Sequence, residues 1–139
     1  MGQGVIVADT NLIVYFLIDG ALTQCAEAWR AADRNWIVPP LFRFELASVL
    51  SGMVAEKKLS RDVALRSFRR GLSLVRVYEF QTDPQELFSV AERTGCSTYD
   101  LEFYLLATRE GCRLITADKQ LIKAFPEVAC DLQLSPEPF

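Results

Sequence analysis

Four acidic residues stand at positions where their carboxylates could do chemistry. Asp9 and Asp118 each follow an apolar run at the point where a predicted strand passes into a predicted helix. Glu45 and Asp100 each interrupt the apolar stripe of a predicted helix, where an unpaired carboxylate would carry a desolvation cost. Ligands of open α/β sheets bind outside the carboxyl ends of the strands. We therefore expect Asp9 and Asp118 at that edge of a sheet, and a four-carboxylate cluster forms there if Glu45 and Asp100 converge with them.

Metal-assisted hydrolysis is the chemistry that such a cluster favours. The mutual repulsion of the carboxylates would raise some of their pKa values unless a cation were present. Mg²⁺ takes oxygen ligands and keeps several waters, and such an ion polarises a phosphoryl oxygen and lowers the pKa of a bound water. The chain has no histidine. This excludes a Ser-His-Asp triad and an HExxH zinc site, but it does not exclude an all-oxygen metal site.

Each of the four residues also has a purely structural interpretation. Asp9 and Asp118 are suited to cap the N-termini of the helices that follow them. Glu45 could lie at the rim of its helix and pair with a cation. Asp100 could form a capping box with Ser97, three residues before it. The residue types leave both interpretations open, and their joint occurrence favours a site.

Strands and helices alternate along the chain. The predicted strands are short and apolar and cover residues 5–8, 36–38, 76–80, 113–117 and 128–132. The predicted helices cover residues 11–18, 21–32, 41–56, 60–74, 83–94, 97–110 and 118–125. We expect the tail, residues 135–139, to be irregular. This order predicts an α/β fold with three α/β/α layers and a mostly parallel central sheet, in a single domain over residues 1–139.

Composition narrows the class of protein further. The chain has 139 residues, 15 Lys and Arg, 18 Asp and Glu and a net charge of −3, which argues against binding nucleic acid with the whole surface. Its four cysteines form no CxxC pair, so we expect reduced and mostly buried thiols. Their even number leaves disulfide pairing as the alternative. The apolar run over residues 5–18 is too short to span a bilayer as a helix. We expect a cytoplasmic protein without a membrane segment.

Four segments together resemble a known family. They are Val-Ala-Asp9-Thr-Asn-Leu, Phe-Glu45-Leu, Thr-Tyr-Asp100-Leu and Leu-Ile-Thr-Ala-Asp118. In order and spacing they are similar to the PIN-domain ribonucleases, and most of all to the VapC toxins of bacterial toxin–antitoxin pairs. The resemblance covers nearly the whole chain and implies a parallel sheet with flanking helices.

The resemblance also implies a function. It makes Asp9, Glu45, Asp100 and Asp118 the residues that bind Mg²⁺ or Mn²⁺ and cleave RNA. It makes Thr116, with either Thr10 or Asn11, a support for the carboxylates or the attacking water. A VapC-like toxin would form a homodimer and would be silenced by an antitoxin that covers the acidic pocket. Leu101 and Glu102 depart from the small residues common after the third acid, and we expect Glu102 to be solvated.

Cations are concentrated in the middle of the chain. The basic cluster consists of Lys57, Lys58, Arg61, Arg66, Arg69 and Arg70, with Arg76 close behind. Such a run is commonly a solvated helix face, but it could also contact RNA phosphates or receive an acidic antitoxin segment. Several aromatic residues lie at spacings typical of a core, and we expect them to be packed inside: Tyr15, Phe16, Phe42, Phe44, Phe103 and Tyr104.

Three other functions remain open at this point. A haloacid-dehalogenase-like phosphatase also uses an Asp after its first strand, but usually has a second Asp where this chain has Asn11. A receiver-like signalling domain would need paired acids after the first strand and a phosphoacceptor near Asp83, which is better explained as a helix cap. A degenerate PIN domain would bind partners without cleaving RNA. The RNA target is not set by the sequence.

Overall fold

The sheet runs through the middle of the molecule. In the computed structural model, which describes residues 4–136, it has five strands in the order β3-β2-β1-β4-β5. The strands are β1 Ile6–Ala8, β2 Trp36–Val38, β3 Val75–Val77, β4 Arg113–Thr116 and β5 Ala129–Asp131. Every pairing between neighbours is parallel. The predicted parallel sheet is therefore confirmed.

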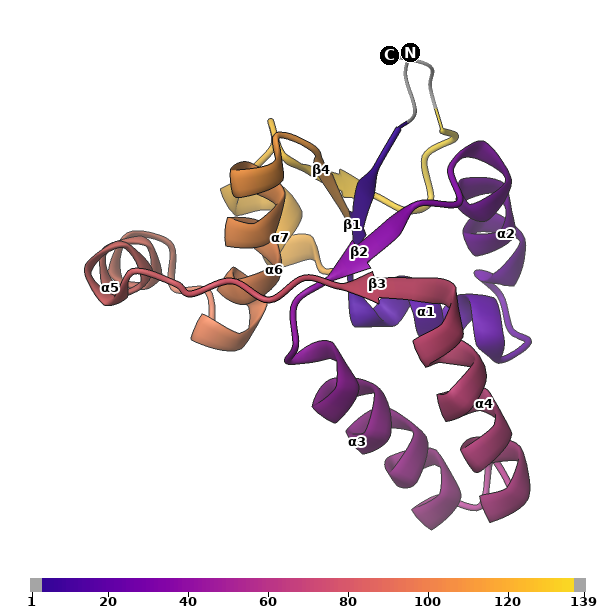
Figure 1. Cartoon of the computed structure of the whole chain (residues 1–139). Coiled ribbons are helices and arrows are strands. Elements are labelled where there is room, and N and C mark those ends of the chain that lie inside the picture. Colours follow the sequence, from indigo (N-terminus) through magenta and orange to yellow (C-terminus); the bar gives the residue numbers. More distant parts are fainter. Residues whose placement is uncertain (1–3, 137–139) are drawn as a thin grey trace.

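Helices cover both faces of this sheet. Within residues 4–136 they are α1 Thr10–Leu17, α2 Thr23–Ala32, α3 Phe42–Ala55, α4 Arg61–Leu74, α5 Pro84–Thr94, α6 Thr98–Glu110 and α7 Lys119–Ala124. Figure 1 shows α5, α6 and α7 on one side of the sheet and α1, α2 and α4 on the other, while α3 extends beyond the lower end of the sheet beside α4. This arrangement confirms the predicted three α/β/α layers.

Local sequence signals set many of the helix ends. Ser60, Asp83 and Ser97 each accept a backbone N–H of the first turn that follows, which satisfies one of the unpaired donors of a helix N-terminus. Gly95 and Gly111 end α5 and α6 in the left-handed conformation, which glycine adopts without a steric penalty. These ends lie where the sequence predicts them.

Other boundaries differ by a few residues. The third and fifth strands are shorter than predicted and end at Val77 and Asp131, and β3 lies at the edge of the sheet with one neighbouring strand. Helix α2 begins at Thr23, because its hydroxyl accepts from the Gly20 N–H and donates to the Tyr15 carbonyl, which holds a turn before the helix. Residues 135–136 form no regular structure, and the rest of the predicted irregular tail lies outside the described residues.

The chain order creates a switch point in the middle of the sheet. Strands β2 and β3 lie on one side of β1, and β4 and β5 lie on the other, so the connections leave β1 and β4 in opposite directions. Val7 and Ala8 in β1 and Leu114 and Ile115 in β4 are fully buried. Ligand sites of doubly wound sheets form at such a point, outside the carboxyl ends of the strands.

The structure also tests two expectations from composition. The cysteines are free thiols, but Cys96 alone is buried, while Cys25, Cys112 and Cys130 are partly exposed. The expectation of mostly buried thiols is therefore wrong for three of the four. None of the helices within the described part of the chain combines the length and the apolar character that crossing a bilayer requires.

Candidate active site

Two of the four acids come together because their strands are paired. Ala8 in β1 lies beside Ile115 in β4, and the Asp9 N–H donates to the Ile115 carbonyl at 3.0 Å. Asp9 caps α1 and Asp118 caps α7. Both carboxylates also line one pocket outside the strand ends. The capping interpretation is thus correct, and it coexists with a place in the pocket.

Asp9 is the most buried of the four acids. It is 5% exposed, and its carboxylate accepts hydrogen bonds from three neighbouring groups. Its Oδ1 accepts from the Thr10 N–H at 2.9 Å, and its Oδ2 accepts from the Thr116 hydroxyl at 2.6 Å and the Asn11 amide at 3.2 Å. Donors from two strand ends therefore hold one carboxylate in one orientation.

Asn11 and Thr116 tie the two strand ends to each other. The Asn11 side-chain carbonyl accepts from the Ala117 N–H at 3.1 Å, while its amide donates toward Thr116 as well as Asp9. The Thr116 hydroxyl, which is fully buried, also accepts from the Asp118 N–H at 2.9 Å. These two side chains fix the positions of both aspartates.

Glu45 enters the pocket from the first turn of α3. Its Oε1 accepts a hydrogen bond from the Thr10 hydroxyl at 2.7 Å. The predicted pairing of Glu45 with a cation at the rim of its helix is therefore replaced by a hydrogen bond from a hydroxyl. Because Thr10 follows Asp9 in the chain, its hydroxyl connects α3 to the end of β1. Thr10 and Asn11 both support an acid, where the resemblance required only one of them.

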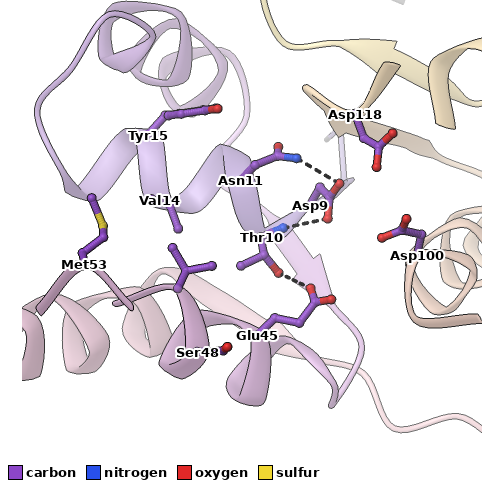
Figure 2. Close-up of a pocket in the computed structure, with 11 residues that line it drawn as sticks. Asp9, Thr10, Asn11, Val14, Tyr15, Glu45, Ser48, Met53, Asp100 and Asp118 are labelled. Carbon is purple, nitrogen blue, oxygen red and sulfur yellow. Dashed lines mark hydrogen bonds between the residues drawn. The ribbon is translucent and has the colours of Figure 1, made fainter. Parts of the chain in front are cut away.

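Asp100 lies across the pocket, in the first turn of α6. Its N–H donates to the Ser97 hydroxyl at 3.1 Å, so Ser97 acts as the predicted cap. The Asp100 carboxylate points toward Asp118 (Figure 2). Burial raises the pKa of Asp100, and the charge of Asp118 raises it further. Asp118 Oδ1 accepts from the Gln120 and Leu121 N–H groups.

The electrostatics of the site favour a cation. Burial raises the pKa of Asp9 to about 7, against the lowering effect of its bonds to Thr116 and Thr10, and the charges of Glu45 and Asp100 raise it further. The pKa values of Glu45 and Asp100 are also raised, in both cases mainly by burial. A positive ion in the pocket would relieve this repulsion.

The donor set fits a hard divalent ion, although the carboxylates are not drawn together around one point. All four acids supply oxygen, which Mg²⁺ and Mn²⁺ prefer. Within residues 4–136, however, no group of three or more His, Cys, Asp or Glu side chains is close enough to hold a metal ion. Asp9, Glu45 and Asp118 instead direct oxygens at Thr10, Thr116 and backbone N–H groups.

The pocket has an acidic half and an apolar half. Its volume is about 530 Å³. The four acids with Thr10 and Asn11 form one half, and the other half is lined by Val14, Tyr15, Val49 and Met53, with Ser48 between (Figure 2). The apolar half was not predicted from the sequence, in which Tyr15 has a spacing typical of core residues. The spacing of Glu45, Ser48, Val49 and Met53 along one helix face was the signal that could have found it.

Two further expectations need correction. Phe44 is 73% exposed, so it is not a core residue. Glu102 is half-buried and its carboxylate accepts a hydrogen bond from the Thr82 hydroxyl, so it is not simply solvated.

The basic cluster lies away from the pocket. Its six residues are exposed, on α4 and on the turn that leads into it, and none of them lines the pocket. Lys58 pairs with Glu56 at 3.1 Å, and the Arg70 guanidinium lies over the Phe16 ring. Exposure is expected both of a solvated helix face and of a surface that contacts RNA or an antitoxin, so the role of this cluster stays a prediction. The six exposed residues of the basic cluster are Lys57, Lys58, Arg61, Arg66, Arg69 and Arg70.

Comparisons with known proteins agree with this architecture. Among solved structures, the chain is similar to PAE2754 from Pyrobaculum aerophilum, with a TM-score of 0.73, 18% identity and coverage of 91% of this chain and 83% of that one. It is also similar to a chain in a toxin–antitoxin complex from Klebsiella pneumoniae, with a TM-score of 0.64, 17% identity and coverage of 94% and 98%.

A third similar structure is VapBC2 from Rickettsia felis bound to a promoter DNA fragment, with a TM-score of 0.65, 16% identity and coverage of 90% and 96%. At these identities the likeness shows the fold. No curated protein matches the chain. The model of the PIN domain family matches residues 6–127, which include all four acids of the pocket. The chain therefore belongs to the PIN domain family.

Proposed function

We propose that the protein is a metal-dependent endoribonuclease that hydrolyses RNA phosphodiester bonds. The observation that carries this proposal is the placement of Asp9, Glu45, Asp100 and Asp118 around one pocket at the switch point of the sheet. PIN domains are generally nucleases, and family membership argues against the phosphatase and receiver-like alternatives. A partner-binding PIN domain without activity is the remaining competitor.

In this proposal Asp9, Glu45, Asp100 and Asp118 hold Mg²⁺ or Mn²⁺. A bound ion of this kind polarises a phosphoryl oxygen and lowers the pKa of a water. Thr116 and Asn11 orient the Asp9 carboxylate, and Thr10 orients Glu45. Such outer contacts set the direction of ligand oxygens before a metal binds. Asp100 and Asp118 would close the site from the other side of the pocket.

We further propose that the protein acts as the toxin of a toxin–antitoxin pair in the cytoplasm. Two similar structures are toxin–antitoxin assemblies, which supports an antitoxin partner. An acidic antitoxin segment would be attracted by the basic cluster, whose Arg61 borders an apolar groove between α3 and α4. A homodimer, as in VapC-like toxins, is part of the same proposal.

The direct test is cleavage of unstructured RNA by the purified protein with Mg²⁺, Mn²⁺ or EDTA. We expect cleavage with either ion, none with EDTA, and none by Asp9→Asn, whose fold should persist because the amide keeps the size of the carboxylate. Circular dichroism and thermal unfolding monitor the fold. Cleavage that persists in EDTA or in the pure Asp9→Asn variant would contradict the proposal.

A further inference from the structure

The apolar half of the pocket has no part in the chemistry of the carboxylates. Hydrolysis at a metal needs oxygen ligands and water, yet Val14, Tyr15, Val49 and Met53 line the same cavity. Val49 is 41% exposed and Tyr15 is partly exposed. Apolar side chains that line a pocket beside a polar centre are typical of a subsite for an apolar part of the ligand.

Two helices place this apolar half at a defined distance from the acids. On α1, Val14 and Tyr15 lie one turn beyond Thr10 and Asn11. On α3, Val49 lies one turn beyond Glu45 and Met53 two turns beyond it. Residues four apart share a helix face, and each turn advances about 5.4 Å along the axis. Both walls of the pocket therefore change from polar to apolar one turn beyond Thr10, Asn11 and Glu45.

Figure 2 shows the same division. Tyr15, Val14 and Met53 lie together at one end of the pocket, and Asp9, Asp100 and Asp118 lie at the other. A ligand that spans the pocket would need a charged group at one end and an apolar, flat group at the other. A nucleotide has this build, because one sugar joins its phosphate to its base.

We infer that the apolar half is a subsite for the nucleobase next to the phosphate that is cleaved. The inference rests on the proposed ribonuclease function and adds a base-binding subsite to it. A base can enter this subsite only when it is unpaired and turned out of its stack. Proteins that read single-stranded RNA take such bases onto aromatic side chains, and Tyr15 is the aromatic residue of this wall.

Abasic substitution in the RNA tests the subsite from the side of the substrate. A single-stranded oligonucleotide that the wild-type protein cleaves is remade with one abasic nucleotide at each position around the cleaved bond. We expect an abasic nucleotide at one flanking position to lower kcat/KM about tenfold or more, as loss of a stacked base does. Equal kcat/KM for all abasic and intact RNAs would overturn the inference.

Substitutions in the pocket test the same subsite from the side of the protein. Val49→Ser and Tyr15→Leu should lower kcat/KM for intact RNA and shrink the penalty of the abasic nucleotide, because groups in contact are not additive. Leu65→Ser is the matched control, since Leu65 is 43% exposed on α4 and does not line this pocket. It should keep the wild-type penalty. Thermal unfolding establishes that each variant is folded.

The outcomes distinguish failure of the base subsite from failure of the ribonuclease function. If the wild-type protein cleaves RNA but Val49→Ser and Tyr15→Leu retain the full abasic penalty, the subsite is wrong and the ribonuclease function stands. If the wild-type protein cleaves no RNA with Mg²⁺ or Mn²⁺, both fail together.

Discussion

The acidic pocket and the helical hairpin, which consists of α3, α4 and residues 56–60 between them, hold their charges in opposite ways. In the pocket, Asp9 is almost fully buried and accepts three hydrogen bonds from fixed donors. In the hairpin, the cations of the basic cluster are exposed, and Lys58 contacts another exposed side chain, Glu56. The pocket carries a desolvation cost, while exposed pairs of this kind contribute little to stability.

This difference in burial decides where a charged residue indicates a functional site. A buried carboxylate persists only where its surroundings compensate its cost, so the donors around Asp9 indicate a built site. Exposed lysines and arginines cost the fold little, so their number alone indicates no site. Four predictions test this difference between buried and exposed charges, beginning with the largest expected effect.

Stability of the metal-free protein should fall as the pH rises from about 4 to about 7. The pKa of Asp9 is raised from 3.8 to about 7 in the folded state, so the folded protein holds a proton that the unfolded chain has lost. Stability therefore decreases with pH in this window, by an amount on the order of 4 kcal/mol. Chemical denaturation in EDTA at several pH values measures it.

Asp9→Asn serves as the control for this pH dependence, because it removes the titrating group and keeps its shape. The difference between the two proteins should grow toward pH 7 in favour of Asp9→Asn. Parallel curves over the whole range would contradict the assignment of Asp9 as a buried, charge-sensitive residue.

Glu45→Gln and Glu56→Gln compare the two regions on one helix. Glu45 lines the pocket from the first turn of α3, while Glu56 lies at the C-terminal end of the same helix and does not line the pocket. Glu45→Gln should lower RNA cleavage by at least about 100-fold, since even outer supports of a metal site carry effects of 10- to 100-fold. Glu56→Gln should leave cleavage within about twofold, because exposed pairs are weak. Similar losses of RNA cleavage in both variants would contradict the difference between the buried pocket and the exposed charges.

Thr116→Val tests the donors that orient Asp9. The variant keeps the size of the buried side chain and removes its hydrogen bond to the Asp9 carboxylate, so cleavage should fall about 10- to 100-fold, with a weaker response to Mg²⁺. Thr108→Val removes an exposed hydroxyl that donates to the Leu105 carbonyl within α6. It should cleave like the wild type, and an unchanged Thr116→Val would show that Asp9 needs no fixed orientation.

Gly71→Val separates stability from chemistry in the hairpin. A Cβ at Gly71 would lie 2.7 Å from Leu46 Cδ2 and 3.1 Å from Leu17 Cδ1, so the fully buried Leu46 side chain or α4 itself would have to shift. Overpacking of this kind costs roughly 1–3 kcal/mol. Urea unfolding should show this loss, and activity per folded molecule should stay unchanged. Gly52→Val, whose Cβ meets nothing within 4 Å, should not destabilise the protein.

Much of the fold follows from signals that act within a few residues. The caps at Ser60, Asp83 and Ser97 and the stops at Gly95 and Gly111 depend on local backbone chemistry, and the structure has them where expected. The fold class follows from the alternation of strands and helices. The exact length of a strand depends on its neighbours in the sheet, and this explains the early end of β3.

Part of the candidate site could also be predicted from the sequence. Asp9 and Asp118 could be placed at one edge because parallel strands end together. The support of Glu45 by Thr10, across 35 positions of the chain, required the packing of α3 against α1. The apolar half was missed because Tyr15 has a spacing typical of core residues, and its partial exposure depends on the opening between two helices.

Titration of Mn²⁺ into the metal-free protein at pH 7.5, followed by calorimetry, tests the central claim that the four carboxylates form one metal site. The account predicts saturable binding to the wild type, release of protons on binding because the pKa of Asp9 is about 7, and loss of binding in Asp9→Asn, with Glu56→Gln unchanged. Equal binding to wild type and Asp9→Asn, or no saturable binding to the folded wild type, would contradict it.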